Sequence, residues 1–290
     1  MLKIIEKTKL WFTLSLVVML IGGIFLVTKG LNFGIEFKGG TQIIIEMGKT
    51  FDKGEADEII KKYDQNAITN IVDETQLEIK SGNSSDEEIS KMTEELKGKY
   101  SLGDNYIVSQ DLISGTIGAE LANKAFIAVS VAMVLILVYI AVRFEFGFGV
   151  AALLSLLHDV LITVGVYAIF QVPVNSPFIA AILTIVGYSI NDTIVIFDRI
   201  RENLKIMRRK PIEEVTNLSI TQTIHRSLNT VATTLITIVA VYIFVPSVRE
   251  FSFPLIVGIA SGSYSSIFIA SPIWVLLKKK GNNKAKVKAA

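Results

Sequence analysis

Two aspartates and one arginine stand in or beside stretches that are apolar enough to cross a membrane. Asp159 and Asp192 interrupt long apolar runs, and Arg226 lies just before another. Charged side chains in lipid are costly and are functional by default. Low-dielectric surroundings favour the neutral form of a carboxyl group, whereas a nearby guanidinium favours the carboxylate. A buried aspartate beside an arginine can therefore switch between two packings as a proton binds and leaves.

Asp192 and Arg226 are expected at similar depth, because each lies near the cytoplasmic end of its helix. Asn191 precedes Asp192 on a helix face that carries other polar side chains at helical spacing. A polar stripe with spacings of three and four continues from Arg226 through Asn229, Thr230, Thr233 and Thr237. This arrangement permits an Asp–Arg pair that responds to protons. The alternative is a static buried pair that fixes helix order.

Asp159 follows His158 near the middle of its apolar run. It has two possible roles, a second point in a proton relay or a neutral acid that is hydrogen-bonded to a neighbouring helix. His158 alone is more typical of a packing or hydrogen-bonding residue than of a ligand. The last apolar run carries small residues at four-residue spacing, which favours close helix contact. These residues are Gly258, Gly262, Ser266 and Ala270.

Six apolar runs must position these side chains. The chain has 290 residues, of which 51% are hydrophobic and 19% charged, and its mean hydropathy is +0.51. Soluble domains usually carry about 25% charged residues, and a spanning helix needs roughly 20 apolar residues. The predicted spans are residues 10–27, 125–142, 147–170, 178–197, 228–245 and 254–277. No cleavage signal follows the first, so we expect an uncleaved anchor.

The distribution of lysine and arginine over the short loops predicts the orientation. Basic residues concentrate at the N-terminus, in the loop of residues 198–226 and in the tail of residues 278–290. We therefore expect both termini in the cytoplasm. The predicted domains are residues 1–28 with the first span, 29–124 as an external domain, 125–277 with the other five spans, and 278–290 as a basic tail.

The external insert has its own pattern of short strands and amphipathic helices. Its predicted elements are residues 41–46, 53–66, 68–72, 76–80, 85–100 and 105–112. Ser85 and Glu88 have the spacing of a capping box before a helix. The order β-α-β-β-α-β predicts a ferredoxin-like domain, with a generic α+β insert as the alternative. The predicted fold class is thus a polytopic α-helical membrane protein with an α+β domain between its first two spans.

Several catalytic and ligand-binding classes are not supported. The absence of cysteine excludes disulfides, thiolate zinc sites and a cysteine nucleophile. Residues 48–50, Gly-Lys-Thr, end like a phosphate-binding loop, but Ile43 stands where that motif needs glycine. The residues before Asp192 lack the Gly-x-Gly-Asp run of an intramembrane aspartyl protease. We therefore expect no enzyme, with no cofactor, no metal and no nucleic-acid partner.

Three longer stretches resemble the SecF branch of the SecD/SecF family. Residues 30–40, GLNFGIEFKGG, resemble the signature that opens its external domain, although Glu36 stands where the family often has aspartate. Residues 187–202, GYSINDTIVIFDRIRE, resemble the fourth-helix motif. Residues 219–234, SITQTIHRSLNTVATT, resemble the beginning of the fifth helix. The resemblance extends over the whole chain.

Within the last motif Thr221 and His225 are departures from the family pattern. The resemblance implies that the proton-linked acid and arginine of the family fall on Asp192 and Arg226. It implies an accessory subunit that works with SecD and the SecYEG channel in the bacterial inner membrane. There the proton motive force would draw preproteins outward, with sodium as the alternative coupling ion. The small membrane protein YajC is a further candidate partner.

Two other functions stay open at this point. One is half of a proton-coupled exporter of small molecules or lipids from the resistance-nodulation-division superfamily. Such chains usually repeat the six-helix unit, so this chain would need a partner. The other is a passive membrane scaffold in which the Asp–Arg pair is structural.

Overall fold

The membrane part of the protein is a bundle of long helices. The structure, a computed structural model, describes residues 2–82, 84–143 and 145–289, so Ala290 of the predicted tail lies outside it. Within this part six segments are long and apolar enough to cross a membrane, as predicted. They are built from α1 (Thr8–Thr28), α5 (Gly115–Arg143), α6 (Phe146–Phe170), α7 (Ser176–Ile206), α8 (Ile212–Phe244), α9 (Arg249–Ser265) and α10 (Ser271–Ala289).

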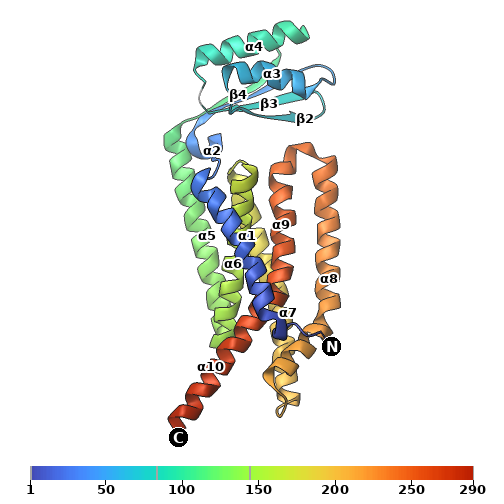
Figure 1. Cartoon of the computed structure of the whole chain (residues 1–290). Helices are drawn as coiled ribbons and strands as arrows, with labels where there is room; N and C mark the ends of the chain where they lie inside the picture. Colours follow the sequence, from blue (N-terminus) through green and yellow to red (C-terminus); the bar gives the residue numbers. More distant parts are fainter. Residues whose placement is uncertain (1, 83, 144, 290) are drawn as a thin grey trace.

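The insert folds as a small α+β domain at one end of the bundle, and both chain termini lie at the other end (Figure 1). Its elements are β1 (Gly40–Glu46), α3 (Lys53–Tyr63), β2 (Ile68–Val72), β3 (Gln76–Ser81), α4 (Asp86–Tyr100) and β4 (Ile107–Ile113). The sheet is antiparallel with strand order β2-β3-β1-β4. The predicted order of strands and helices is therefore confirmed.

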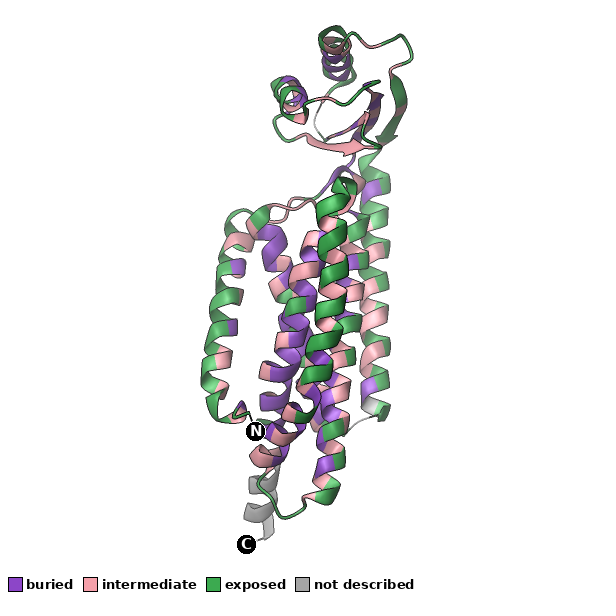
Figure 2. Cartoon of the chain, turned by 90° about the vertical axis from the view of Figure 1, so that its right-hand side faces the viewer, coloured by how far each residue is buried: buried purple, intermediate pink, exposed green. Residues whose placement is uncertain are grey.

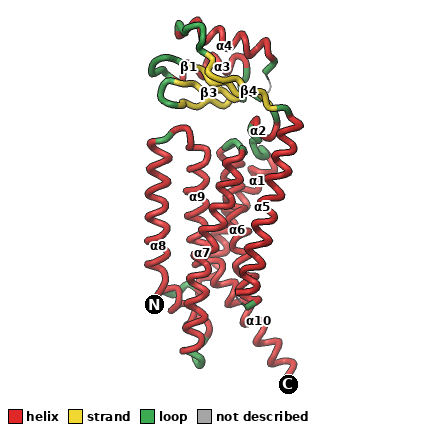
Figure 3. Tube along the Cα trace, turned by 180° about the vertical axis from the view of Figure 1, so that it is seen from behind, coloured by secondary structure: helices red, strands yellow, loops and turns green. Residues whose placement is uncertain are grey.

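Alternation along the strands explains how this domain packs. Successive side chains of a strand point to opposite faces, and β1 and β3 alternate between half-buried and buried positions. Ile43, Ile45, Leu77 and Ile79 fill the face beneath α3 and α4. The two helices cover the side of the sheet away from the membrane bundle, as seen from behind in Figure 3. The other face of the sheet is thus turned toward the membrane helices.

The predicted capping box fixes the start of α4. Ser85 Oγ accepts a hydrogen bond from the Glu88 backbone N–H at 3.3 Å. The Glu88 carboxylate accepts one from the Ser85 backbone N–H at 2.8 Å. Each side chain therefore satisfies an amide that the first helical turn leaves unpaired.

Small residues bring the membrane helices into close contact. A Cβ placed on Gly22 of α1 would lie 2.9 Å from Gly165 Cα of α6. On α9, Gly258 lies against Ile185 and Gly262 against Ser189, both on α7. The predicted packing role of the small residues is therefore confirmed at these two positions. Helix α9 then passes through a π-helical turn, η3 (Ser266–Ala270), before α10.

Burial is concentrated on α6, α7 and α9, whereas α5 and α8 are largely exposed (Figure 2). The buried residues of α8 all lie between Val215 and Ser227, in the first half of the helix. The second half of α8 carries the predicted polar stripe, and its residues are half-buried or exposed. The hydroxyls of Thr233 and Thr237 donate to carbonyls one turn earlier in α8. In a membrane the exposed Arg226 and Asn229 need water or another protein surface to cover them.

Candidate proton-coupling site

One oxygen of the Asp192 carboxyl group accepts a hydrogen bond, and the other has no donor among the described residues. Asp192 lies on α7 and is half-buried. Ser227 Oγ of α8 donates a hydrogen bond to its Oδ1. Its Oδ2 is buried and accepts no hydrogen bond from any residue that the structure describes. A buried oxygen without a donor is costly for a carboxylate, so Oδ2 is the atom where a proton would be taken up.

Asp192 and Arg226 face a shared cavity of about 170 Å³ between α7, α8 and α9. Asn191 also lines it, so three of the four predicted site residues meet at one place. Both Asn191 and Arg226 are exposed in the isolated chain. The lining residues are Tyr188, Asn191, Asp192, Val195, Arg226, Thr230, Val231, Ile259 and Ser263.

A direct ion pair between Asp192 and Arg226, which the spacing permitted, is not formed in this structure. Ser227 contacts the carboxylate in its place. Consecutive residues of an α-helix point about 100° apart, because a turn takes 3.6 residues. Helix α8 in this orientation therefore presents Ser227 to Asp192 and leaves Arg226 exposed beside the cavity.

Asp159 lies outside this cavity, at the centre of a buried cluster of hydrogen-bond donors. Its side chain is fully buried. Ser189 Oγ and Ser265 Oγ donate to its Oδ2, each at 2.6 Å. Ser261 Oγ donates to its Oδ1 at 2.9 Å, and His158 Nδ1 lies 2.9 Å from the same oxygen. This one carboxyl group thus ties α6 to both α7 and α9.

His158 connects the Asp159 cluster to an apolar groove of about 370 Å³ between α1, α6 and the last span. Its Nε2 is buried and has no hydrogen-bond partner among the described residues. An ionised Asp159 would require the proton of a neutral His158 to sit on Nδ1, because a carboxylate only accepts. His158 therefore acts here as a hydrogen-bonding residue, in agreement with its predicted role.

A short chain of polar groups links the two aspartates. Ser189, which donates to Asp159, accepts a hydrogen bond at its carbonyl from Ser266 Oγ at 3.3 Å. Ser266 Oγ is in turn 2.8 Å from Thr193 Oγ1, next to Asp192. A rearrangement of α7 against α9 would therefore change the surroundings of both carboxyl groups.

The fold and the site together define a class of protein. It is a multi-pass membrane transport protein that carries a carboxyl group and a guanidinium in one intramembrane cavity and a folded domain at one end. The family profile described as "Protein export membrane protein SecD/SecF, C-terminal" matches residues 91–280, and the "SecD/SecF GG Motif" matches residues 24–50. The chain belongs to the SecD/SecF family of protein export membrane proteins.

Two relatives match almost the whole length of this chain. The protein translocase subunit SecF of Sebaldella termitidis is 38% identical over 288 residues, which are 96% of this chain and 92% of the relative. The protein translocase subunit SecDF of Bacillus subtilis is 38% identical, with 94% of this chain matched to 38% of the relative.

A solved structure shows the same fold. The crystal structure of SecDF from Thermus thermophilus, described as a translocon-associated membrane protein, superposes with a TM-score of 0.80 at 34% sequence identity. The match covers 96% of this chain and 39% of that one. This chain thus corresponds to one part of a SecDF polypeptide.

Proposed function

We propose that this chain is an accessory subunit of the bacterial Sec translocase that uses the proton motive force to promote preprotein translocation. In this proposal it assembles with SecD beside the SecYEG channel in the cytoplasmic membrane. Both termini lie in the cytoplasm, and the α+β domain lies outside. The subunit catalyses no covalent step and needs no cofactor besides the coupling proton.

The observation that carries the proposal is the unpaired Oδ2 of Asp192 in the cavity that Arg226 also lines. Protonation at this oxygen removes the negative charge that attracts Arg226. Loss of the proton restores that charge and draws the guanidinium toward the carboxylate. The two states differ in the packing of α7 against α8, which is a two-state element that a proton gradient can drive.

The available energy is sufficient for such a switch. One elementary charge that crosses the membrane potential yields about 2.3 kcal/mol per 100 mV. A tenfold change in the ratio of two conformations needs about 1.4 kcal/mol. One proton per cycle can therefore shift the packing of α7 and α8 substantially.

The uncovered face of α8 supports a partner subunit. Arg226 and Asn229 on this helix are exposed, and a membrane would not solvate them. The hydroxyls of Thr233 and Thr237 already donate to carbonyls within the helix. The SecDF relatives carry about three fifths of their length beyond the part that matches this chain. A separate SecD chain would supply that part and cover the cavity mouth.

The proposal is tested by export assays in membrane vesicles that contain the chain, SecD and the translocon. We expect Asp192→Asn and Arg226→Ala to assemble in normal amounts and to lose the part of export that depends on the proton gradient. Glu202→Gln, which alters an exposed carboxylate on the same helix whose ion pair with Arg199 stays within that helix, is the control. Export of both site variants at the wild-type rate would show a passive scaffold. Failure to co-purify any Sec component would favour a small-molecule or lipid exporter.

A further inference from the structure

The segment that leads into the external domain is fastened to the turn between α6 and α7. Gly34 N donates to Val174 O at 3.0 Å, and Val174 N donates to Asn32 O at 2.8 Å. Asn32 Nδ2 donates to Gln171 O at 3.2 Å. Residues 32–34 thus run alongside residues 171–174 like a short strand pair.

Glu36 lies at the end of this fastened segment, in the short helix α2 (Ile35–Lys38). The Ser176 backbone N–H donates to Glu36 Oε2 at 2.8 Å, and Ser176 Oγ donates to the same oxygen. Ser176 is the first residue of α7, the helix that carries Asp192. The α7 N-cap residue, Asn175, forms no capping hydrogen bond of its own. A carboxylate at a helix N-terminus is stabilised both by the free amides and by the helix dipole.

The fit around this contact is tight. A Cβ on Gly34 would lie 1.7 Å from Asn175 Oδ1, so any larger residue would require the buried Asn175 side chain to move. A Cβ on Gly118 of α5 would lie 2.7 Å from Phe37 O. Helix α2 is therefore held between α5 and the N-terminus of α7, and it continues through Gly39 directly into β1.

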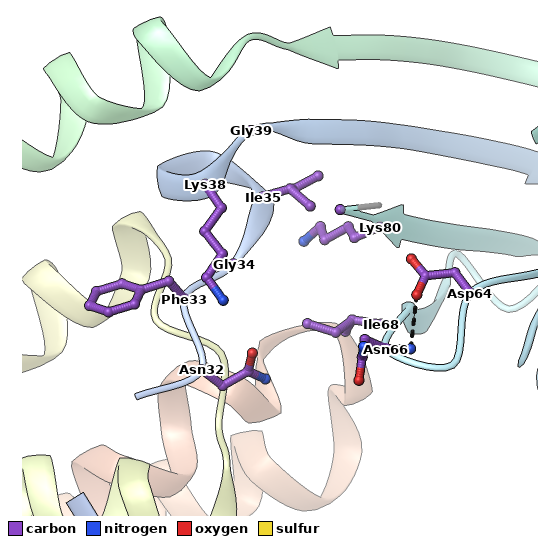
Figure 4. Close-up of a pocket in the computed structure, with 11 residues that line it drawn as sticks. Asn32, Phe33, Gly34, Ile35, Lys38, Gly39, Asp64, Asn66, Ile68 and Lys80 are labelled. Carbon is purple, nitrogen blue, oxygen red and sulfur yellow. Dashed lines mark hydrogen bonds between the residues drawn. The ribbon is translucent and has the colours of Figure 1, made fainter. Parts of the chain in front are cut away.

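A cavity lies beneath the domain, beside the Glu36 contact. A cavity of about 540 Å³ separates the fastened segment from the edge of the sheet formed by β2 and β3. Figure 4 shows Lys38 and Lys80 pointing into it from opposite sides. The domain is attached to the bundle through α2 and through β4, which is followed at once by α5. In addition, β2 lies against the turn η2 (Pro246–Val248) between α8 and α9.

We infer that Glu36 is a positioning residue that couples the external domain to α7. We call its contact with Ser176 the Glu36 clasp. A movement of α7 that starts at Asp192 reaches α2 through the clasp and passes into β1. This inference rests on the proposed function, since it assumes that Asp192 drives the movement. It assigns to Glu36 the task of transmitting that movement rather than of binding a proton.

The first test measures the position of the domain. The chain has no cysteine, so spin labels can be placed at Lys91→Cys on α4 and Val245→Cys at the end of α8. The full chain assembled with its partner should give one narrow distance distribution. Glu36→Ala should reduce the clasped population roughly tenfold relative to the released one and broaden the distribution. Glu36→Gln keeps an oxygen acceptor and should fall between the two.

Matched variants separate coupling from folding. Glu87→Ala removes an exposed carboxylate from α4, on the far side of the domain, and should leave the distribution unchanged. Ser176→Ala removes only one of the two clasp hydrogen bonds and should broaden the distribution less than Glu36→Ala. An unchanged distribution in Glu36→Ala would overturn the inference.

The second test measures gradient-dependent export with Asp192→Asn in parallel. We expect Glu36→Ala to lose this part of export although the protein assembles normally. If Asp192→Asn loses it and Glu36→Ala keeps it, the clasp inference is wrong and the proposed function stands. If Asp192→Asn keeps it, the proposed function is wrong, and the distance measurement alone decides whether Glu36 positions the domain.

Discussion

We expect the side chain at position 159 to stabilise the helix bundle, and to do so more strongly when it offers more acceptor oxygens to the surrounding donors. Three hydroxyl donors reach it from α7 and α9, and His158 approaches from α6. Hydrogen bonds between membrane helices are worth about 0.6 kcal/mol each on average. Asp159→Leu, which removes both acceptors at similar volume, should therefore cost about 2 kcal/mol. Unsatisfied hydroxyls in the core would raise this toward about 4 kcal/mol.

Asp159→Asn offers a graded comparison. Asparagine keeps one oxygen acceptor and places an amide donor where the other oxygen was. We therefore expect Asp159→Asn to lose about half as much unfolding free energy as Asp159→Leu. The measurement is reversible unfolding of the full chain in detergent, with Ser261→Ala in a double-mutant cycle against Asp159→Asn. A change below about 0.5 kcal/mol for Asp159→Leu would refute the view that this carboxyl group holds the helices together. If the variants are stable but lose gradient-dependent export, Asp159 is a relay point.

Two further predictions concern packing and pH. Gly22→Val should separate α1 from Gly165 on α6 and lower the yield of folded protein, whereas Gly23→Val, which meets open space, should not; size-exclusion profiles of the two variants provide the comparison. Hydrogen bonds from the backbone N–H and the hydroxyl of Ser85 hold the pKa of Glu88 below its ordinary value of 4.5. The stabilisation by this cap is therefore complete above pH 4.5 and is lost as the pH falls through the lower folded-state pKa. Amide exchange at the start of α4 should then differ between wild type and Glu88→Gln at neutral pH and converge in acid, and an equal difference at both pH values would contradict this reasoning.

Much of the fold could be predicted from local signals in the sequence. The length of the apolar runs predicted the six spans, and alternation predicted the strands of the external domain. The Ser85 capping box depends on residues three apart, so it could be read directly. Close helix contact at Gly258 and Gly262 was also predictable, because the absence of a side chain is itself the signal.

Contacts between distant segments could not be predicted in the same way. The donors around Asp159 come from three helices, and no spacing along the chain relates Ser189 to Ser261. A weak signal was present, since Ser261 and Ser265 lie four residues apart on one face of α9. The contact of Glu36 with Ser176 joins residues 140 positions apart, which only the folded arrangement brings together.

The relation between Asp192 and Arg226 was predicted in part. Similar depth in neighbouring helices placed both residues at one cavity. The rotation of α8 about its own axis decides whether Ser227 or Arg226 meets the carboxylate. The two arrangements differ by about 100°, the angle between consecutive helical residues. The spacing of polar residues along the sequence does not specify the rotation that finely. This rotation is also the movement that the proposed switch would use.

In the proposed switch, the charge of Asp192 controls its distance from Arg226. Solid-state NMR of the full chain with its partner in lipid bilayers can measure the separation of Asp192 Cγ and the Arg226 guanidinium nitrogens. We expect the two side chains to form a close pair at alkaline pH and to separate at acidic pH. In Asp192→Asn they should be separated at every pH. A distance that stays constant across the pH range in the wild-type protein would contradict the proposed switch.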